Sequence, residues 1–409
     1  MAEIFKLKNQ VKDYPWGSPY FIPRLLGLVE NGTPYDDAPC AELWMGVHPG
    51  APSQVILPDG NKNLGEFISR DPNHYLGEKT AKRYAALPYL FKLLAAQTPL
   101  SIQAHPNLKQ AQEGFERENR EGLSIDAPNR SYKDSNHKPE IICALTPFTG
   151  MCGFRSPEEI RGLLAAFLDN IPKTKGLAPL IKILEKNEKE ILKDFLNELF
   201  NLSDDVRKSL TVNVLSIPDE LNNSPEYSLM REFAQLYPED PAVISPLYLN
   251  VFRLEPGEAI YLKAGLLHAY CGGFGVELMA NSDNVLRGGL TGKHIDIPEL
   301  MHVLDFNPAA VQIIKPVPGS PVFTYPAPCG EFSLTVIQNS GETETIDFSP
   351  EGPSIGIVTE GKLNINDMIL KRGESVFIPP TAPGDNLKLQ GTFTFHVASV
   401  GSDNAGISP

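Results

Sequence analysis

A short internal repeat restricts the fold of this chain more than any other feature of its sequence. Residues 257–262, Gly-Glu-Ala-Ile-Tyr-Leu, are matched by residues 373–378, Gly-Glu-Ser-Val-Phe-Ile. In each copy a Gly-Glu turn precedes a run of β-branched and aromatic residues, and glycine permits the tight or left-handed backbone that such a turn needs. The repeat therefore predicts two related β units.

Most of the chain has the pattern of short strands joined by turns. Its 37 prolines and 33 glycines are spread through short apolar segments, and we expect strands at 55–57, 100–104, 251–254 and 393–397. The middle of the chain is different. Residues 156–159, Ser-Pro-Glu-Glu, have the form of a helix capping box. Apolar residues recur at helical spacing after it, over 180–200, and over 226–236, which predicts a block of helices.

Gly-Glu turns of this kind are typical of the cupin fold, a small double-sheet jelly roll in which a strand presents a metal ligand just after the turn. The first copy is followed by His268, whereas the second is not followed by a histidine, and His396 is the only histidine after residue 303. We therefore predict a mainly β protein with two cupin-like jelly-roll domains and a helical insertion domain. The expected division is a metal-bearing catalytic cupin of residues 1–154 plus 246–305, a helical insertion of 155–245, and a metal-free cupin-like domain of 306–409.

The composition argues against several classes of partner and compartment. The net charge of -14 disfavours nucleic acid and anionic membrane surfaces. No apolar run approaches the roughly 20 residues that span a bilayer, and the N-terminus does not resemble a secretory signal. The five cysteines are scattered and form no CxxC pair. We expect a cytoplasmic protein without structural disulfides and without nucleic-acid or membrane partners.

Three segments supply side chains that suit a metal ion. Residues two apart on a strand share a face, so Ser101, Gln103 and His105 are expected to point the same way. Residues 136–140, Asn-His-Lys-Pro-Glu, precede an apolar run, and His268 follows the first Gly-Glu strand. Each segment alone also has an ordinary structural interpretation. Together they offer two imidazoles, one carboxylate and one amide oxygen, a set that suits zinc with an open position for water or substrate.

A fourth segment, residues 276–294, supplies positive charge on a glycine-rich loop. Arg287, Lys293 and His294 fall within eight residues of one another. Glycines let the backbone approach a ligand closely, and arginine with lysine provides donors for phosphate. With Lys138, these residues form a candidate cationic pocket in an otherwise acidic protein. The segment lacks the GxxxxGK[ST] spacing of a nucleotide-binding P-loop.

The four segments together resemble the signature segments of type I mannose-6-phosphate isomerases. They read Leu-Ser-Ile-Gln-Ala-His-Pro-Asn at 100–107, Asn-His-Lys-Pro-Glu at 136–140, His-Ala-Tyr at 268–270 and Ser-Asp-Asn-Val-Leu-Arg-Gly-Gly-Leu-Thr at 282–291. They occur in the family's order and at similar separations, and residues 14–17, 41–49 and 87–92 also resemble family segments.

The resemblance implies an activity, a cofactor and a set of site residues. The activity is the zinc-dependent interconversion of mannose 6-phosphate and fructose 6-phosphate through an enediol(ate), with one Zn²⁺ per chain. The zinc ligands correspond to Gln103, His105, Glu140 and His268. Arg287 corresponds to the proposed catalytic arginine, and Ser101, Lys138 and Lys293 match positions for substrate or phosphate.

The residue that moves the proton stays open at this point. His137 and Lys138 are the favoured pair, and Glu277 and Asp283 are alternatives that serve as relay or orienting groups. Each of these residues is equally an ion-pair partner for a neighbouring charge. Tyr270 and Trp16 are expected to line the substrate pocket, whereas His48, His74 and His302 are expected to be packing or surface residues.

Two functions from other classes compete with the isomerase. A non-catalytic sugar-phosphate-binding regulatory cupin protein would lack a ligand or the arginine, and both are present. A cupin dioxygenase would favour iron with histidine-rich ligands and would have no use for a cationic loop. Nothing in the sequence requires more than a monomer that binds a small sugar phosphate.

Overall fold

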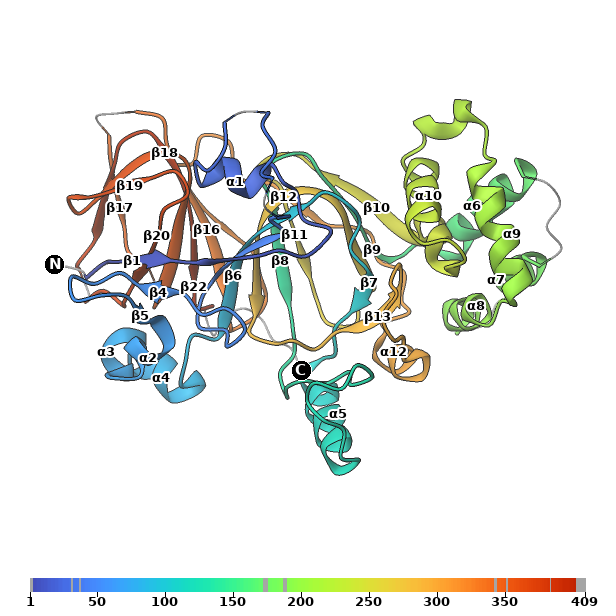
Figure 1. Cartoon of the computed structure of the whole chain (residues 1–409), viewed down its shortest axis with the longest axis horizontal. Coiled ribbons are helices and arrows are strands. Elements are labelled where there is room, and N and C mark those ends of the chain that lie inside the picture. Colours follow the sequence, from blue (N-terminus) through green and yellow to red (C-terminus); the bar gives the residue numbers. More distant parts are fainter. Residues whose placement is uncertain are drawn as a thin grey trace.

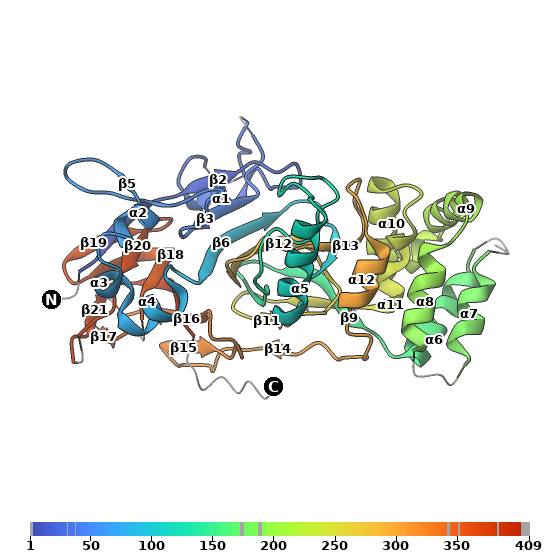
Figure 2. The same cartoon turned by 90° about the horizontal axis from the view of Figure 1, so that it is seen from below.

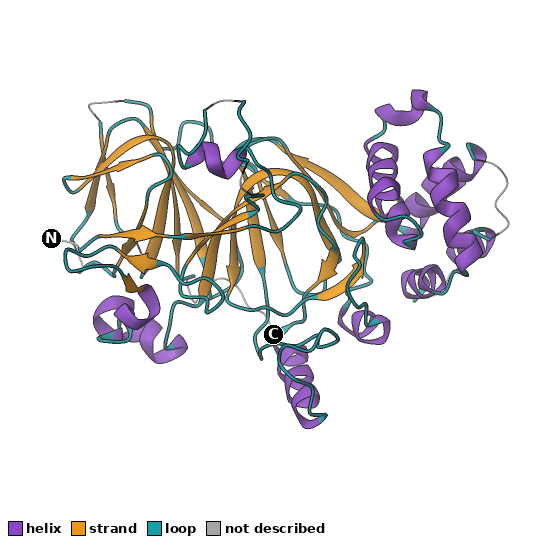
Figure 3. Cartoon of the chain, in the orientation of Figure 1, coloured by secondary structure: helices purple, strands orange, loops and turns teal. Residues whose placement is uncertain are grey.

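Two β regions lie side by side in the protein, and a group of helices lies beyond one of them (Figures 1 and 3). The computed structural model describes residues 3–30, 32–36, 38–171, 176–186, 190–341, 344–350, 352–382 and 384–401. In this part of the chain no helix is long and apolar enough to cross a membrane. The predicted mainly β fold with two β regions and a helical insertion is confirmed.

The first β region is built on an antiparallel sheet that we call the central sheet. Its strand path is β14-β11-β8-β12-β6-β3-β2, and β7, β9, β10 and β13 pair beside it. The long strand β12 pairs with β7 and β9 at its start and with β6 and β8 further along, so it belongs to both walls of the region. The strands are β2 (Gln10–Lys12), β3 (Glu42–Met45), β6 (Tyr89–Ala96), β7 (Ile102–Ala104), β8 (Glu140–Ala144), β9 (Phe148–Phe154), β10 (Leu249–Leu254), β11 (Ala259–Leu262), β12 (His268–Ala280), β13 (Leu286–Gly289) and β14 (Ile313–Ile314).

The second β region is built on the C-terminal sheet, with the strand path β15-β16-β22-β18-β20-β1-β4-β5. Strands β17, β19 and β21 pair beside this path. The strands are β1 (Phe5–Lys8), β4 (Gln54–Val55), β5 (Lys62–Asn63), β15 (Val322–Tyr325), β16 (Ser333–Asn339), β17 (Thr345–Phe348), β18 (Ser354–Ile365), β19 (Met368–Lys371), β20 (Ser375–Ile378), β21 (Leu387–Gln390) and β22 (Phe393–Ser399).

Three strands from the N-terminal part of the chain pair into the C-terminal sheet. Strand β1 pairs with β20, where Phe5 lies opposite Phe377, and β4 and β5 extend the sheet from β1. The expected block of residues 1–154 assigns these strands to the other β region. Pairing between strands this far apart in sequence leaves no local pattern, which is why the sequence does not reveal it. The predicted domain division remains a prediction. These three strands fall within its first domain but pair into the C-terminal sheet.

The helical block starts where the sequence predicts. Helix α6 (Pro157–Asp169) begins with a capping box, in which Ser156 Oγ accepts from the Glu159 amide at 3.3 Å and Glu159 accepts from the Ser156 amide at 3.0 Å. The periodic stretch over 180–200 forms two helices rather than one, and its residues 187–189 lie outside the described residues. The block contains α6, α7 (Ala178–Leu184), α8 (Ile191–Phe200), α9 (Asp204–Leu215), α10 (Pro225–Leu236), α11 (Ser245–Tyr248) and two 3₁₀ turns, Asp219–Asn223 and Pro241–Ile244.

The remaining helices border the sheets. Figure 2 shows α5 and α12 close together beside the central sheet, and α2, α3 and α4 beside the C-terminal sheet. They are α1 (Phe21–Leu25), α2 (Leu64–Ile68), α3 (Pro72–Leu76), α4 (Glu78–Tyr84), α5 (Leu108–Arg120) and α12 (Ile297–Val303).

The internal repeat forms equivalent turns in the two regions. Gly257 precedes β11 with φ of 88° and Gly373 precedes β20 with φ of 84°. Both angles lie in the left-handed range that favours glycine. The prediction of two Gly-Glu turns that lead into strands is confirmed.

Candidate metal centre and active site

Three neighbouring strands place the predicted site residues in one row. His268 at the start of β12 lies opposite Gln103 on β7, and Gln103 lies opposite Arg287 on β13. Residues directly opposite one another in a sheet project from the same face with their side chains close together. The row therefore brings an imidazole, an amide and a guanidinium together although the three residues are far apart in sequence.

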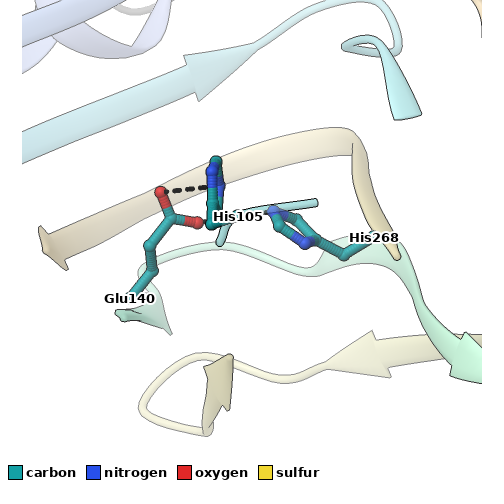
Figure 4. A group of neighbouring side chains, drawn as sticks. All are labelled: His105, Glu140 and His268. Atoms are coloured by element: carbon teal, nitrogen blue, oxygen red, sulfur yellow. Dashed lines mark ion pairs between the residues drawn. The ribbon is translucent and has the colours of Figure 1, made fainter. Parts of the chain in front are cut away.

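A buried cluster of His105, Glu140 and His268 lies beside this row. Figure 4 shows the three side chains turned toward one another. Glu140 Oε1 is 3.4 Å from His105 Nε2, and Glu140 Oε2 is 3.4 Å from His268 Nε2. One ligand atom from each residue fits within 4.8 Å of the others. All three residues are at most 2% exposed.

The protonation of the two histidines suits metal binding. His105 Nδ1 lies 2.7 Å from the carbonyl oxygen of Asn284, and His268 Nδ1 lies 2.9 Å from that of Leu266. A carbonyl only accepts, so each Nδ1 carries the proton and each Nε2 presents a lone pair to the cluster. Burial lowers the pKa of His105 to about 4, which keeps its ring neutral near pH 7.

Three polar atoms of the cluster lack hydrogen-bond partners. Within the described part of the chain His105 Nε2, Glu140 Oε2 and His268 Nε2 are buried and have no hydrogen bond. Buried polar atoms are normally paired, because leaving one unpaired costs about 1–3 kcal/mol. Three such atoms that converge fit a divalent metal ion with imidazole and carboxylate ligands.

Lys138 contacts the carboxylate of the cluster directly. Its Nζ lies 3.1 Å from Glu140 Oε1, and both side chains are at most 10% exposed. Burial alone would raise the pKa of Glu140, but Lys138 and His105 hold it well below the usual range. Glu140 is therefore ionised and available as a ligand.

His137 turns away from the cluster. Its Nε2 is 3.0 Å from Glu331 Oε1, a residue that precedes β16 of the C-terminal sheet. The structure thus separates the favoured His137–Lys138 pair. Only Lys138 lies against Glu140, and His137 links the loop that carries it to the second β region.

Two cationic side chains near the row, Arg287 and Lys293, have no anionic partner among the described residues. Arg287 and Lys293 form no side-chain hydrogen bond or ion pair with any described residue. Burial lowers the pKa of both groups, and repulsion from Arg287 and Lys133 lowers that of Lys293 further. Positive groups held together in this way fit an anionic ligand such as phosphate.

Known proteins match the chain over nearly its whole length. A family model described as phosphomannose isomerase type I, catalytic domain, matches residues 4–157. The mannose-6-phosphate isomerase of Escherichia coli is 39% identical over 380 residues, which cover 91% of this chain and 94% of that protein. The bovine mannose-6-phosphate isomerase is 34% identical and covers 92% of this chain and 93% of its own length.

This chain belongs to the type I phosphomannose isomerase family.

Solved structures of phosphomannose isomerases share the fold. A mutant of the Salmonella typhimurium phosphomannose isomerase superposes with a TM-score of 0.87 at 34% identity and covers 98% of this chain and 100% of that one. A zinc-bound mannose 6-phosphate isomerase gives the same TM-score, identity and coverage. The cupin-like fold class predicted from the repeat agrees with these family members.

A buried ion-pair group lies next to the His105–Glu140–His268 cluster and was missed by sequence reasoning. Lys92 on β6 is 3.1 Å from Glu277 Oε2 on β12 and 3.4 Å from Glu42 Oε1 on β3. All three side chains are at most 8% exposed. The available signal was Lys92 itself, a lone charge in a strand whose eight residues are all buried. Glu277, a candidate relay residue, is therefore engaged by Lys92.

The second candidate relay residue, Asp283, is held by a histidine that was expected to be packing or surface. His48 is buried, its Nε2 is 3.2 Å from Asp283 Oδ2, and its Nδ1 accepts from the Gly50 amide at 3.1 Å. Nε2 consequently carries the proton and donates to Asp283. This hydrogen bond is the main cause of the lowered pKa of Asp283. His74 is exposed and pairs with Glu3, as a surface residue does.

Asn284 ties the metal centre to the loop before Glu140. Its side chain accepts from the amides of Lys133 and Asp134 at 2.7 and 3.2 Å and donates to the carbonyl oxygens of Asp134 and Asn136 at 2.8 and 2.9 Å. Its own carbonyl oxygen accepts from His105. No sequence pattern indicated this role, because it depends on two loops that are 150 residues apart.

The two aromatic candidates occupy one apolar cluster. Tyr270 is 2% exposed, and Trp16 packs partly buried against the same group of residues. Burial raises the pKa of Tyr270 well above its usual value. Ser101 immediately precedes β7 and is partly exposed.

Proposed function

We propose that this chain is a zinc-dependent mannose-6-phosphate isomerase that interconverts mannose 6-phosphate and fructose 6-phosphate. The observation that carries the proposal is the buried His105–Glu140–His268 cluster, with three unpaired ligand atoms, beside the row that holds Gln103 and Arg287. Curated relatives that carry this enzyme name cover more than nine-tenths of the chain.

Gln103, His105, Glu140 and His268 are the proposed ligands of one Zn²⁺. Two imidazole nitrogens, a carboxylate and an amide oxygen are suitable ligands for zinc, and a further position stays open to substrate. When bound, zinc supplies a Lewis acid that polarises the sugar carbonyl and orients the open-chain form. Asn284 and Leu266 keep the two rings in the tautomer that binds.

The cations hold the substrate and stabilise charge. We assign Lys293 and Ser101 to the phosphate, with Trp16 and Tyr270 along the sugar. Binding energy at the phosphate, remote from the reacting carbons, holds C1 and C2 in register. Arg287, which has no ion-pair partner among the described residues, is free to stabilise the negative charge that develops on the enediolate oxygen.

Lys138 is our choice for the residue that transfers the proton. In the aldose-to-ketose direction Lys138, after it has given its ammonium proton to solvent, removes the C2 proton as a neutral amine, and an enediol(ate) forms. The hydroxyl proton moves from the C2 oxygen to the C1 oxygen, and the ammonium returns the abstracted proton to C1. Lys138 is buried against Glu140, whereas His137 is paired with Glu331. Asp283 and Glu277 are proposed as relay or orienting groups, because each is already held by a neighbour, His48 or Lys92.

This assignment of the base is tested by two single variants. Lys138→Ala should lower kcat by roughly 10²–10⁴-fold, the usual contribution of general acid–base catalysis. His137→Ala should leave kcat within a few-fold and lower stability by no more than about 1 kcal/mol, since its ion pair is partly exposed. A large loss of kcat in His137→Ala with near-normal turnover in Lys138→Ala would reverse the assignment.

The proposed activity is tested by a coupled assay of fructose 6-phosphate formation from mannose 6-phosphate. We expect turnover in the zinc-loaded protein, loss after chelation and recovery when zinc is restored. Sugar-phosphate binding without turnover in the fully loaded protein would favour the alternative, a non-catalytic regulatory cupin protein.

The cellular setting is part of the same proposal. We propose a cytoplasmic monomer that takes a small sugar phosphate and has no nucleic-acid or membrane partner. The net charge of -14 supports this choice, because it repels nucleic acid and anionic membrane surfaces.

A further inference from the structure

A second polar cavity lies at the junction of the two β regions. Its volume is about 360 Å³, which falls within the range of small-molecule sites. Helix α1 lies over this junction (Figure 1) and contributes Phe21, Arg24 and Leu25 to the lining. The central sheet contributes Phe274, and the C-terminal sheet contributes Tyr325, Val336 and His396.

The cavity is separate from the metal centre. Strand β8 begins at Glu140, a candidate zinc ligand, and ends at Ala144, which lines the cavity. Four residues of extended strand span roughly 13 Å. None of the candidate catalytic or metal-binding residues lines the cavity.

The wall of the cavity presents a buried acceptor without a partner. His396 is 2% exposed, and its Nδ1 is 3.1 Å from Thr359 Oγ1. The Thr359 hydroxyl donates its own proton to the carbonyl oxygen of Thr394 at 3.3 Å, so it accepts from the Nδ1–H of His396. Nε2 of the same ring then carries a lone pair and has no hydrogen-bond partner among the described residues. Burial lowers the pKa of His396 to about 4, which keeps the ring neutral.

The rim of the cavity carries positive charge. Arg24 and Arg372 both line it, and Arg372 is positioned by a hydrogen bond from its guanidinium to the carbonyl oxygen of Arg24 at 3.1 Å. Neither guanidinium is paired with a carboxylate in the described part of the chain. Glu360 is the one acidic residue of the lining, and it accepts from the Thr394 hydroxyl at 3.4 Å. Two arginines that adjoin a pocket favour a planar or tetrahedral oxyanion.

Aromatic rings complete the lining. Phe21 and Phe274 stack at a centroid distance of 5.3 Å, and the Tyr325 hydroxyl is already used in a 2.7 Å hydrogen bond to the Gly257 carbonyl oxygen. These groups offer an apolar surface to the carbon skeleton of a ligand in the cavity that the two arginines and His396 also line.

We propose that this cavity binds a small hydroxylated anion, a polyol phosphate or a polyol carboxylate. The arginines bind the anionic group, and a hydroxyl of the ligand donates to His396 Nε2. The site is additional to the isomerase centre and does not depend on the proposed activity.

Calorimetric titration with glycerol 2-phosphate tests the anion site. The probe carries a phosphate and two hydroxyls, and glycerate replaces the phosphate by a carboxylate. We expect at least one probe to bind with millimolar or tighter affinity. This binding should survive in Lys293→Glu, which reverses the charge of the cation assigned to phosphate in the catalytic pocket. Arg372→Glu should weaken this binding by roughly 10–100-fold, the effect of losing a charge-assisted contact. The matched control Arg161→Glu reverses an exposed charge on α6 and should change nothing.

Propan-2-yl phosphate tests the histidine, because it has the same skeleton without hydroxyls. In the wild-type protein glycerol 2-phosphate should bind roughly fivefold to tenfold more tightly, the value of one hydrogen bond. His396→Phe should remove that difference, and His396→Gln, which restores an acceptor, should recover part of it. Isomerase turnover should be unchanged in Arg372→Glu and His396→Phe.

Three results would overturn the proposal. They are the absence of probe binding in Lys293→Glu, equal binding by Arg372→Glu and Arg161→Glu, and equal weakening of both phosphate probes in His396→Phe. The last result would mean that His396 only packs.

Discussion

The two β regions share an arrangement of strands and turns but differ in the side chains that their strands direct inward. In the first region the inward positions include His105, Glu140 and His268, with the Lys92 ion-pair group beside them. In the second region the strands enclose an apolar cluster that includes Val358 and Phe395, and the described residues there form no group of possible metal ligands. The comparison shows that the fold supplies a scaffold and that a few inward side chains decide whether it holds a metal.

The single histidine of the second region illustrates the same point. His396 lies on β22 between Phe395 and Val397, and both of these neighbours belong to the apolar interior. Successive side chains of a strand point to opposite faces, so His396 faces the central sheet instead. It is therefore no counterpart of His268, and among the described residues no group of possible metal ligands surrounds it.

The largest expected effect comes from removing the carboxylate of the first region. Glu140→Gln should abolish stoichiometric zinc binding and lower turnover by roughly 10³-fold or more, because the metal and its several kcal/mol of charge stabilisation are lost together. Elemental analysis of the purified protein and the coupled assay measure both quantities. The control Glu374→Gln makes the same change at the second Gly-Glu turn and should retain zinc and activity. Zinc lost from both variants would break the comparison between the regions.

A core substitution in the second region should affect stability alone. Phe395→Ala leaves a cavity in the apolar cluster and should lower the free energy of unfolding by about 3–5 kcal/mol. Urea denaturation measures that loss. Zinc content and kcat of the folded protein should be unchanged, and a selective loss of zinc would show that the second region helps to form the metal centre.

A smaller effect is expected when the side chain at position 287 keeps its positive charge but loses the planar guanidinium group. Arg287→Lys should lower kcat by roughly 10²-fold with zinc retained, because one lysine cannot reproduce the planar donors of the guanidinium beside a developing oxyanion. Steady-state kinetics on the zinc-loaded variant gives the ratio. An unchanged kcat with a raised KM would assign Arg287 to substrate binding only.

The smallest predicted effect is a pH dependence of substrate binding. Burial and repulsion from Arg287 and Lys133 lower the pKa of Lys293, so its cationic form is lost at a lower pH than for an ordinary lysine. Because Lys293 is the proposed phosphate-binding cation, KM should rise by about tenfold as alkaline pH passes through this lowered pKa. Lys293→Arg remains charged and should show a flat KM over the same range. An identical alkaline rise in both proteins would place the titrating group elsewhere.

Part of the candidate site could be predicted from sequence because some proposed ligands lie in a local pattern, whereas Glu140 was predicted mainly from the family resemblance. His268 follows a Gly-Glu strand, and His105 lies at the end of a strand, just before Pro106. Gln103 lies on β7, and pairing with β12 and β13 places it opposite His268 and Arg287. The capping box of α6 could also be predicted from sequence, since all its atoms lie within four residues.

The remaining features depend on contacts between distant segments. The pairing of β1 with β20, the Asn284 bridge and the turn of His137 toward Glu331 each join residues that are more than 140 positions apart. His48 is buried against Trp44, as a packing residue is, and its contact with the candidate relay residue Asp283 also joins distant segments.

X-ray absorption at the zinc K-edge tests the central claim, that the first β region alone holds the metal. We predict one zinc per chain with two imidazole nitrogens and oxygen ligands at about 2.0–2.2 Å, and one imidazole fewer in His268→Ala that has been reloaded with zinc. Cys152 lies opposite His268 in the ladder of β12 and β9, which makes sulfur the natural competing ligand. A zinc–sulfur distance of about 2.3 Å, or an unchanged imidazole count in the variant, would contradict the account.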